Sequence, residues 1–488
     1  MSKNKVYLTT TLPYVNAAPH LGFAAELCHA DIIARYHLLK GDEVFFNTGT
    51  DEHGLKIYQA AAAALETPGD FVAAAAAPFK NLLPALGVWS GANFIRTTDA
   101  AHAAAAQEFW RRSAAAGDIY KKNYQTKYCV GCELEKTDSE LTDGRCSLHP
   151  NRELELVEEE NYFFRFSKYQ KPLSELYEKN PNFVVPESRF HEIRAFVERG
   201  LTDFSVSRLR SKLPWGIPVP DDPAQTMYVW FDALVNYISA IGWPHDLEKF
   251  EKWWVESGGV IQFAGKDNLR QQAAMWQAML MSAGLPPSRQ IIIRGFIQSG
   301  GQKMSKSLGN VLDPFALVNE YGAEAVRYFL ARHVNPFEDS EVTPEKFKEA
   351  YNANLANGLG NLVSRVMKMA TVNGIKFDEA EAMRISATEE FENYYREHTK
   401  NLANFDIQKS IDMVWREITL ADELIQREAP FKKIKTDKAT AEKDVKNLLA
   451  RLWFIAVQLE PFLPQTAKTI QELIAANQMP AAPLFPRK

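Results

Sequence analysis

The stretch that decides the fold is KVYLTTTLPYVNAAPHLGF, residues 5–23, which changes from strand to helix character partway along. Residues 5–12 are rich in β-branched, aromatic and leucine side chains and predict a strand. A helical pattern follows over residues 21–39, and Gly41 stands where glycine commonly ends a helix. Residues 43–48, EVFFNT, predict a second strand. Strand, helix and strand in this order predict a parallel sheet with functional groups at the carboxyl ends of its strands.

The rest of the chain first continues this pattern and then leaves it. Further strands are expected near residues 226–230, 260–263 and 290–294, as a second half of the same sheet. Between about 120 and 196 the pattern turns irregular and favours an inserted domain. From Pro344 onward strand signals vanish, and amphipathic segments with few glycines predict a helical bundle.

The composition is that of an ordinary globular protein. Of the 488 residues, 46% are hydrophobic and 24% are charged, which excludes a disordered or collagen-like chain. The formal net charge of −5 gives no global basic field, so any contact with nucleic acid must come from local clusters. The first residues lack the apolar region of a signal peptide, and no stretch approaches the length of a membrane helix. We therefore expect a cytoplasmic protein with no membrane association.

Three of the four cysteines lie close together. Two residues separate Cys129 from Cys132 and Cys146 from His149, and thirteen separate the two pairs. This spacing resembles a zinc knuckle and predicts one structural Zn²⁺, because four protein ligands leave no position for water. The alternatives are a disulfide and unrelated surface residues, and the odd local number of cysteines and a reducing cytosol weaken the disulfide. Cys28 falls in the predicted first helix and is expected to be a small buried residue.

A histidine and a glycine open the first helix, in Pro19-His20-Leu21-Gly22. Backbone N–H groups at a helix start attract phosphate, and the missing Cβ of Gly22 allows close approach. His20 can then donate to a phosphate oxygen as charge develops. Taken alone, this pattern also fits a helix cap or a packed ring.

A second motif is the pentapeptide KMSKS at residues 303–307, which follows Gly300 and Gly301. Two lysines beside hydroxyl residues on a glycine-hinged loop can close over a triphosphate and supply charge in the transition state. A solvated basic turn is the alternative for such a short segment.

Together the two motifs resemble the HIGH and KMSKS signatures of class I aminoacyl-tRNA synthetases. The resemblance is specifically to the methionyl-tRNA synthetase family and extends over nearly the whole chain. Its supporting segments are TLPY at 11–14, TGTDEHG at 48–54, YVWFDA at 228–233, GKD at 265–267 and NLVSR at 361–365. The family implies ATP-dependent activation of L-methionine to methionyl-adenylate and transfer to the 3′ end of tRNA(Met), with Zn²⁺ structural and Mg²⁺ accompanying ATP.

The resemblance also implies roles for the matching residues. The catalytic residues would be His20, Lys303 and Lys306, with Gly22, Arg208 and Ser305 binding ATP. The methionine site would comprise Leu12, Tyr14, Asp51, Trp230, Ala233, Tyr237 and Gln272, although Leu12 and Ala233 fit simple packing nearly as well. The metal ligands would be Cys129, Cys132, Cys146 and His149, and the tRNA anticodon would meet Asn361, Arg365 and Phe431.

Four positions depart from the family pattern. Phe23 replaces a polar residue, usually histidine, at the end of the first signature. Asn268 stands for an apolar residue, and Gln272 for a histidine near the methionine. Gln272 can form hydrogen bonds but cannot titrate near neutral pH. Phe431 replaces the tryptophan that stacks on the anticodon.

The expected fold class is α/β: a parallel-sheet Rossmann-like catalytic domain with an inserted zinc-knuckle domain and a C-terminal all-α bundle. The expected domains are 1–119 and 201–343 for the two catalytic halves, 120–200 for the insertion and 344–488 for the helical anticodon-binding domain. Because the chain stops without an added dimerisation module, a monomer is expected. Competing functions are a class I synthetase for another amino acid, a small-molecule nucleotidyltransferase, and a non-catalytic tRNA-binding relative.

Overall fold

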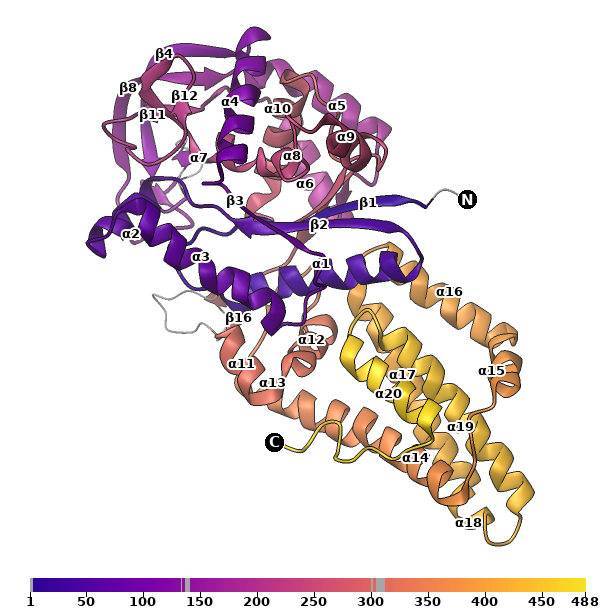
Figure 1. Cartoon of the computed structure of the whole chain (residues 1–488). Coiled ribbons are helices and arrows are strands. Elements are labelled where there is room, and N and C mark those ends of the chain that lie inside the picture. The colour runs from indigo at the N-terminus through magenta and orange to yellow at the C-terminus, as the bar shows by residue number, and fades with distance from the viewer. Residues whose placement is uncertain (1–2, 133, 137–140, 300–301, 304–311) are drawn as a thin grey trace. The chain divides into compact units, whose positions relative to one another are not determined.

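The structure is a computed structural model that describes residues 3–132, 134–136, 141–299, 302–303 and 312–488 (Figure 1). The chain forms two compact units. The first unit consists of Met1–Ala18, Asp42–Asn81 and Gly91–Ile293. The second consists of Pro19–Gly41, Leu82–Ser90 and Arg294–Lys488.

A sheet of six strands forms the centre of the first unit, in the order β3-β2-β1-β14-β15-β9. The strands are β1 (Lys5–Thr9), β2 (Glu43–Thr50), β3 (Asn93–Arg96), β9 (Val184–Val185), β14 (Val260–Gly265) and β15 (Gln290–Arg294). β1 pairs in parallel with both β2 and β14, β2 with β3, and β15 with β9. Tyr7, Leu8 and Phe46 are fully buried on these strands. The predicted parallel sheet is confirmed, as is the assignment of residues 260–263 and 290–294 to it.

The strand predicted at residues 226–230 belongs elsewhere. β13 (Asp222–Met227) pairs antiparallel with β11 (Ser207–Leu209) and β12 (Pro218–Val219) in a separate sheet. After Tyr228 the chain turns into the short helix α7 (Val229–Ala233). The prediction was wrong because a short apolar run fits a buried helix as well as a strand, and periodicity alone does not separate them.

The inserted segment is more regular than its sequence indicates. Its main feature is a long antiparallel pair, β4 (Ile119–Cys129) and β8 (Glu155–Phe164), in register from Ile119 opposite Phe164 to Tyr128 opposite Glu155 (Figure 1). Shorter strands complete it: β5 (Leu134–Lys136), β6 (Leu141–Thr142), β7 (Arg145–Cys146) and β10 (Phe204–Ser205). Charged residues interrupt the apolar alternation on both long strands, so the strand signal is weak in the sequence.

Helices of the first unit connect these strands. They are α2 (Leu55–Ala63), α3 (Pro68–Ala85), α4 (Ala100–Ala115), α5 (Gln170–Lys179), α6 (Glu187–Glu198), α8 (Asn236–Ser239), α9 (Leu247–Phe250) and α10 (Trp276–Ser282). α3 ends in a segment of the second unit.

The second unit begins with α1 (Leu21–Leu39), whose bounds match the predicted helix. Cys28 is fully buried in it, as expected. Asp31 accepts from Nη1 of Arg327 at 2.7 Å, and the Arg327 Nε donates to the carbonyl of Phe462, also at 2.7 Å. Both charged side chains are completely buried. This paired, hydrogen-bonded charge fixes α1 to the helical part of its own unit.

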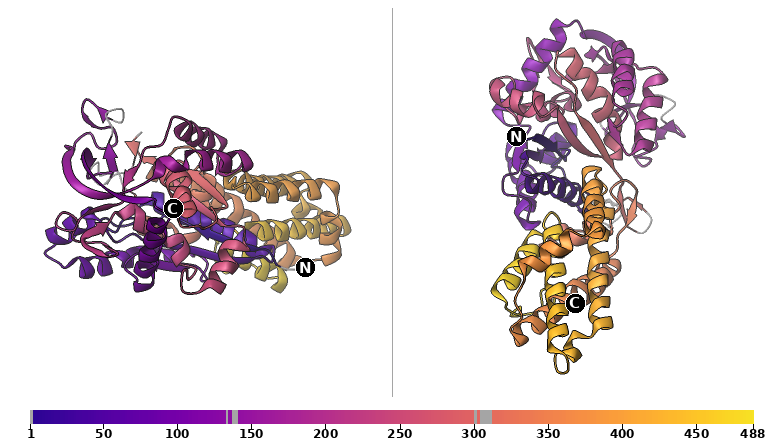
Figure 2. Two further views of the ribbon diagram at one scale, coloured as in Figure 1. Left: turned by 90° about the horizontal axis from the view of Figure 1, so that it is seen from above. Right: turned by 90° about the vertical axis from the view of Figure 1, so that its right-hand side faces the viewer.

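Helices dominate the remainder of the second unit, where a small sheet is formed by β16 (Ile297–Ser299), β17 (Gln302–Lys303) and β18 (Ser340–Glu341). The helices are α11 (Pro314–Tyr321), α12 (Ala323–Arg332), α13 (Pro344–Ala350), α14 (Asn361–Asn373), α15 (Glu379–Ser386), α16 (Glu389–Ala403), α17 (Ile407–Glu428), α18 (Pro430–Lys433), α19 (Lys438–Leu459) and α20 (Pro464–Ala476). α17 lies beside α16 and α19, as the orange and yellow helices of Figure 2 show. The predicted all-helical C-terminal region is confirmed. Within the ranges given above, no helix has the length and apolar character needed to cross a lipid bilayer.

Candidate functional site

Two loops meet at the carboxyl ends of β1 and β2. Tyr14 and Asp51 form an isolated parallel bridge there. The Asp51 N–H donates to the carbonyl of Pro13 at 3.0 Å, and the Val15 N–H donates to the carbonyl of Asp51 at 3.4 Å. Only 5% of Asp51 is exposed. Two predicted methionine-site residues are thus neighbours, with the half-buried Leu12 on the same loop.

Three further predicted residues lie on the successive short helices α7 and α8. Trp230 and Ala233 belong to α7, and Tyr237 to α8. The Tyr237 carbonyl accepts from the hydroxyl of Tyr7 on β1 at 2.7 Å, which ties α8 to the sheet. Among the described residues, the buried indole N–H of Trp230 meets no acceptor.

Gln272 belongs to a buried network of amides and hydroxyls. Its Nε2 donates to the Tyr237 hydroxyl oxygen at 2.8 Å, and its Oε1 accepts from Nε2 of Gln262 at 2.7 Å. The Oε1 of Gln262 accepts from the hydroxyl of Ser288. Gln272 therefore contacts Tyr237, another predicted site residue, and Gln262 fixes the orientation of its amide.

The structure adds a buried charged group that the sequence analysis did not assign. The Asp232 carboxylate is fully buried, 3.2 Å from Nδ1 of His53 and 3.8 Å from Nε2 of His102. Burial alone raises the pKa of this carboxyl, but the two histidines hold it below the usual value. His53 and Asp232 fall inside the quoted segments 48–54 and 228–233, which was the available signal.

An ion pair holds the loop that carries Asp51. The buried Glu52 carboxylate accepts from Nε and Nη2 of Arg96 at 2.7 and 2.8 Å. Its backbone carbonyl accepts from the indole N–H of Trp215 at 2.6 Å. Such bidentate pairing fixes the orientation of the Glu52 carboxylate. Asp51 is therefore held by its own backbone bonds to Pro13 and Val15 and by the contacts of its neighbour Glu52.

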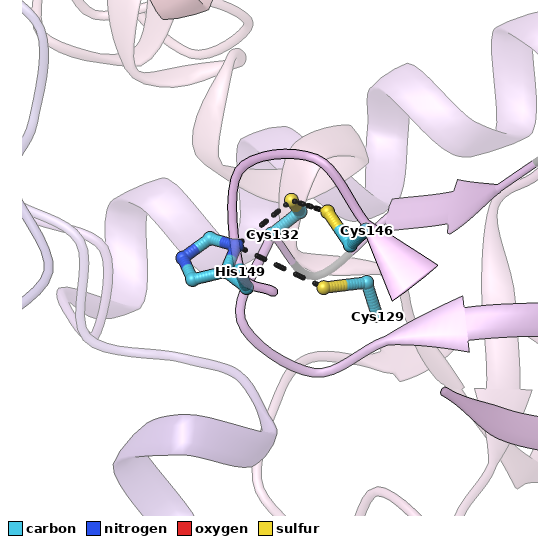
Figure 3. Close-up of side chains that lie close together, drawn as sticks. All are labelled: Cys129, Cys132, Cys146 and His149. Atoms are coloured by element: carbon cyan, nitrogen blue, oxygen red, sulfur yellow. Dashed lines mark hydrogen bonds between the residues drawn. The ribbon is translucent and has the colours of Figure 1, made fainter. Parts of the chain in front are cut away.

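The four predicted metal ligands converge on one point of the insertion (Figure 3). Their donor atoms all lie within 4.8 Å of one another, with 3.2 Å between the Cys132 sulfur and Nδ1 of His149. All of the cysteines are free, so the disulfide alternative is not realised. Three thiolates and an imidazole at these separations fit a tetrahedral Zn²⁺ with Zn–S of about 2.3 Å. The donor set is therefore suited to a structural ion.

Arg208 lies between the insertion and α7. Its guanidinium is 5.1 Å from the ring centre of Tyr128 and 4.9 Å from that of Tyr228. Its Nη1 donates to the Ser205 hydroxyl at 2.6 Å and to the Ser207 carbonyl at 2.8 Å. The side chain is thus held in a fixed orientation between two aromatic faces.

The predicted ATP motif lies in the second unit. His20 is the N-cap of α1, and its Nδ1 accepts from the Phe23 N–H at 3.3 Å. A Cβ at Gly22 would lie 2.9 Å from the His20 ring, so glycine lets the ring fold over the helix start. The cap alternative is therefore realised in the structure. A helix start can also bind phosphate through its backbone N–H groups, so the cap by itself does not contradict the predicted role of His20.

The second motif is only partly described. The backbone of Lys303 belongs to β17. Ser305 and Lys306 lie outside the described residues.

The predicted anticodon residues lie on helices of the second unit. Asn361 and Arg365 are one turn apart at the start of α14, and Arg365 forms an ion pair with Asp422 on α17. Phe431 lies on α18 and is 48% exposed, so about half of its side chain is accessible.

Family models match nearly the whole chain. The model described as tRNA synthetases class I (M) matches residues 6–148 and 131–367. The model described as the anticodon binding domain of methionyl tRNA ligase matches residues 373–483.

Relatives and solved structures agree with these models. The chain is 41% identical to methionine–tRNA ligase of Thermosynechococcus vestitus, over 95% of this chain and 88% of the relative. It is 39% identical to methionine–tRNA ligase of Rhizobium meliloti, over 96% and 91%. The structure resembles Mycobacterium tuberculosis methionyl-tRNA synthetase in complex with methionyl-adenylate, with a TM-score of 0.90 and 34% identity over 99% of this chain and 100% of that one.

Proposed function

The chain belongs to the methionine–tRNA ligase family of class I tRNA synthetases, and from this premise we propose that it activates L-methionine with ATP and transfers the methionyl group to tRNA(Met). The observation that carries the proposal is similarity at 41% identity across 95% of the chain, including the helical region. Cytoplasmic protein synthesis is the process that this activity serves.

The methionine site is proposed at the loops after β1 and β2. Asp51 would hold the substrate ammonium, because a buried carboxylate binds a cation strongly once water is excluded. The aromatic faces of Tyr14, Trp230 and Tyr237 suit a polarizable thioether. Leu12 and Ala233 would complete the apolar wall, and Gln272 would act through Tyr237.

In the first step, a methionine carboxylate oxygen attacks the α-phosphorus of ATP. A phosphorus–oxygen bond forms, the bond to the β-phosphate bridging oxygen breaks, and pyrophosphate leaves with the electron pair. Gly22 and the start of α1 would approach the phosphates, with His20 donating to them. Lys303 and Lys306 would add positive charge from the other motif, and the Ser305 hydroxyl would offer a hydrogen bond to ATP. Arg208, oriented by its two tyrosines, would also bind the phosphates. Mg²⁺ bound with ATP would neutralise part of the triphosphate charge.

In the second step, a terminal ribose hydroxyl of the tRNA attacks the methionyl carbonyl and AMP leaves. Asn361, Arg365 and Phe431 are proposed to select the tRNA through its anticodon. Asparagine and arginine offer hydrogen bonds to base edges, and an exposed ring offers a stacking surface worth roughly 1–3 kcal/mol per base. The knuckle would hold Zn²⁺ through Cys129, Cys132, Cys146 and His149, where the ion orders the insertion.

The proposal is tested by ATP–pyrophosphate exchange with each of the twenty amino acids. Exchange that depends on methionine is expected. Exchange with another amino acid would favour a different class I synthetase, and the absence of a long editing insertion already argues against those for leucine, isoleucine and valine. Exchange with none of them would favour a non-catalytic tRNA-binding protein. Charging of tRNA by purified protein then separates a synthetase from a small-molecule nucleotidyltransferase.

A further inference from the structure

One lysine touches both the knuckle and the proposed methionine site. Lys56 lies in the first turn of α2, a few residues after Asp51. Its Nζ donates to the carbonyl of Gly131 at 2.5 Å. The same Nζ lies 5.3 Å from the ring centre of Tyr14, within the range of a cation–π interaction.

Gly131 connects this lysine to the metal ligands. It lies between Cys129 and Cys132, and a Cβ built on it would be 2.5 Å from Cγ of His149. The His149 ring thus packs directly on the Gly131 backbone. The turn from Cys129 to Cys132, which carries two of the ligands, thus also carries the carbonyl that holds Lys56.

Apolar side chains also connect the knuckle to the proposed methionine site. Tyr128 and Val130 of the knuckle strand form a buried cluster with Tyr228 and Val229. Three partly buried side chains pack against this cluster: Tyr14, Leu55 and Trp230. Two of these three are proposed methionine-site residues. The wall of the proposed pocket is therefore built partly on the knuckle.

We propose that Lys56 is a positioning residue that links metal occupancy of the knuckle to methionine binding. The metal fixes the turn, the turn holds the Lys56 ammonium through the Gly131 carbonyl, and the ammonium holds the Tyr14 ring in place. This inference rests on the proposed function, since it takes Tyr14 as part of the methionine site. Because linkage is reciprocal, methionine must raise the affinity of the knuckle for metal by the same factor.

The test compares the parent protein with Lys56→Met and Lys56→Arg. The methionine side chain introduced at position 56 keeps the length and the apolar stem of lysine, but it lacks the charge and cannot donate the hydrogen bond. Binding of labelled L-methionine is measured by equilibrium dialysis on metal-loaded and chelator-treated full-length protein, and Zn²⁺ affinity is measured by chelator competition with and without methionine. The matched control is Lys122→Met. It removes an exposed lysine on β4, the strand that leads to Cys129, where Lys122 lies over the ring of Phe163 on β8.

With metal bound, Lys56→Met is expected to weaken methionine binding about tenfold, the size of one charged contact. Its Zn²⁺ content should be unchanged, and methionine should no longer raise its Zn²⁺ affinity. Lys56→Arg should retain most of the coupling, and Lys122→Met should behave like the parent.

The inference is overturned if metal-loaded Lys56→Met binds methionine as the parent does, or if methionine raises the Zn²⁺ affinity of both equally. The Zn²⁺ competition decides the matter even where chelated protein no longer binds methionine. If the parent itself shows no methionine-dependent pyrophosphate exchange, the proposed function fails. If the parent is active in exchange but methionine does not change its affinity for Zn²⁺, only the role of Lys56 is refuted.

Discussion

The Nε2 of Gln272 donates a hydrogen bond to the hydroxyl oxygen of Tyr237 across 2.8 Å, and each residue is only 1% exposed. A histidine at this position could gain a proton, whereas the glutamine amide keeps one charge state at every pH. With Gln262 fixing the Gln272 amide, the Tyr237 hydroxyl accepts from the protein, and its own proton is directed away from Gln272.

Replacing Gln272 by leucine should loosen the proposed methionine site. The change removes the hydrogen bonds of Gln272 to the Tyr237 hydroxyl and to the Gln262 amide, which costs about 1–3 kcal/mol in the free energy of unfolding. The KM for methionine in pyrophosphate exchange should rise, while the KM for ATP stays unchanged. Gln290→Leu, which removes only a bond to the Asn182 carbonyl, is the control. A parent-like KM in Gln272→Leu would exclude a role in positioning Tyr237.

Neutralising Asp51 should weaken methionine binding far more than ATP binding. Asp51→Asn keeps the shape but removes the charge proposed to meet the ammonium, an interaction of about 1.5–3 kcal/mol, so the KM for methionine should rise roughly 10- to 150-fold. Asp70→Asn, at the exposed start of α3, is the matched control. Steady-state exchange kinetics at varied methionine and varied ATP measure both constants. If the KM for methionine and the KM for ATP rose equally, Asp51 would only stabilise the loop and would not bind the ammonium.

Loss of one knuckle ligand should abolish metal binding. We expect one Zn²⁺ per chain in the purified protein and almost none in Cys132→Ala, because a three-ligand site no longer closes around a structural ion. Cys28→Ala, which removes the buried cysteine of α1, should keep its full metal content. Elemental analysis of dialysed protein measures the stoichiometry. A metal-free parent would contradict the assignment of the cluster.

Truncating Arg365 should affect tRNA and leave amino-acid activation intact. Arg365→Ala should raise the KM for tRNA in aminoacylation about 5- to 150-fold, since a lost base contact costs about 1–3 kcal/mol. Methionine-dependent exchange should not change. Lys368→Ala, one turn along the same exposed side of α14, controls for general loss of charge. Asp422→Asn breaks the ion pair but keeps the guanidinium, so if it reproduced the whole defect, Arg365 would act on helix packing only.

The helical region should lose stability in mild acid through His398. Burial lowers the pKa of His398 to about 4. The folded histidine therefore stays neutral while the unfolded one takes up a proton near its ordinary pKa of about 6.5. Stability from this group is complete above that pH and falls as the pH drops toward 4, by about 2 kcal/mol between pH 7 and pH 5.

Urea unfolding of parent and His398→Gln at both pH values measures this contribution. The variant should lose the extra pH dependence, because glutamine does not titrate. His191→Gln, at an exposed histidine on α6, should keep it. An identical pH dependence in parent and His398→Gln would contradict the lowered pKa.

Local sequence patterns predicted much of the fold. The helix over residues 21–39, the parallel strands on either side of it and the all-helical C-terminal region followed from periodicity and end signals. The strand expected at residues 226–230 did not, because a short apolar run fits the buried helix α7 as well as a strand. The long pair β4 and β8 was also missed, since its charged residues hide the alternation.

By itself, the sequence determined which chemical groups are available and which of them are neighbours along the chain: the close pairs of the knuckle, the histidine and glycine at a helix start, and the asparagine and arginine one turn apart. These follow from the spacing along the chain together with the local helix and turn patterns that the sequence predicts. Only the tertiary structure decided that Lys56 meets the carbonyl of Gly131, that Gln272 meets Tyr237, and that Asp232 lies between His53 and His102. Those contacts join residues far apart in the chain, and they exist because packing of the first unit brings different helices and loops together.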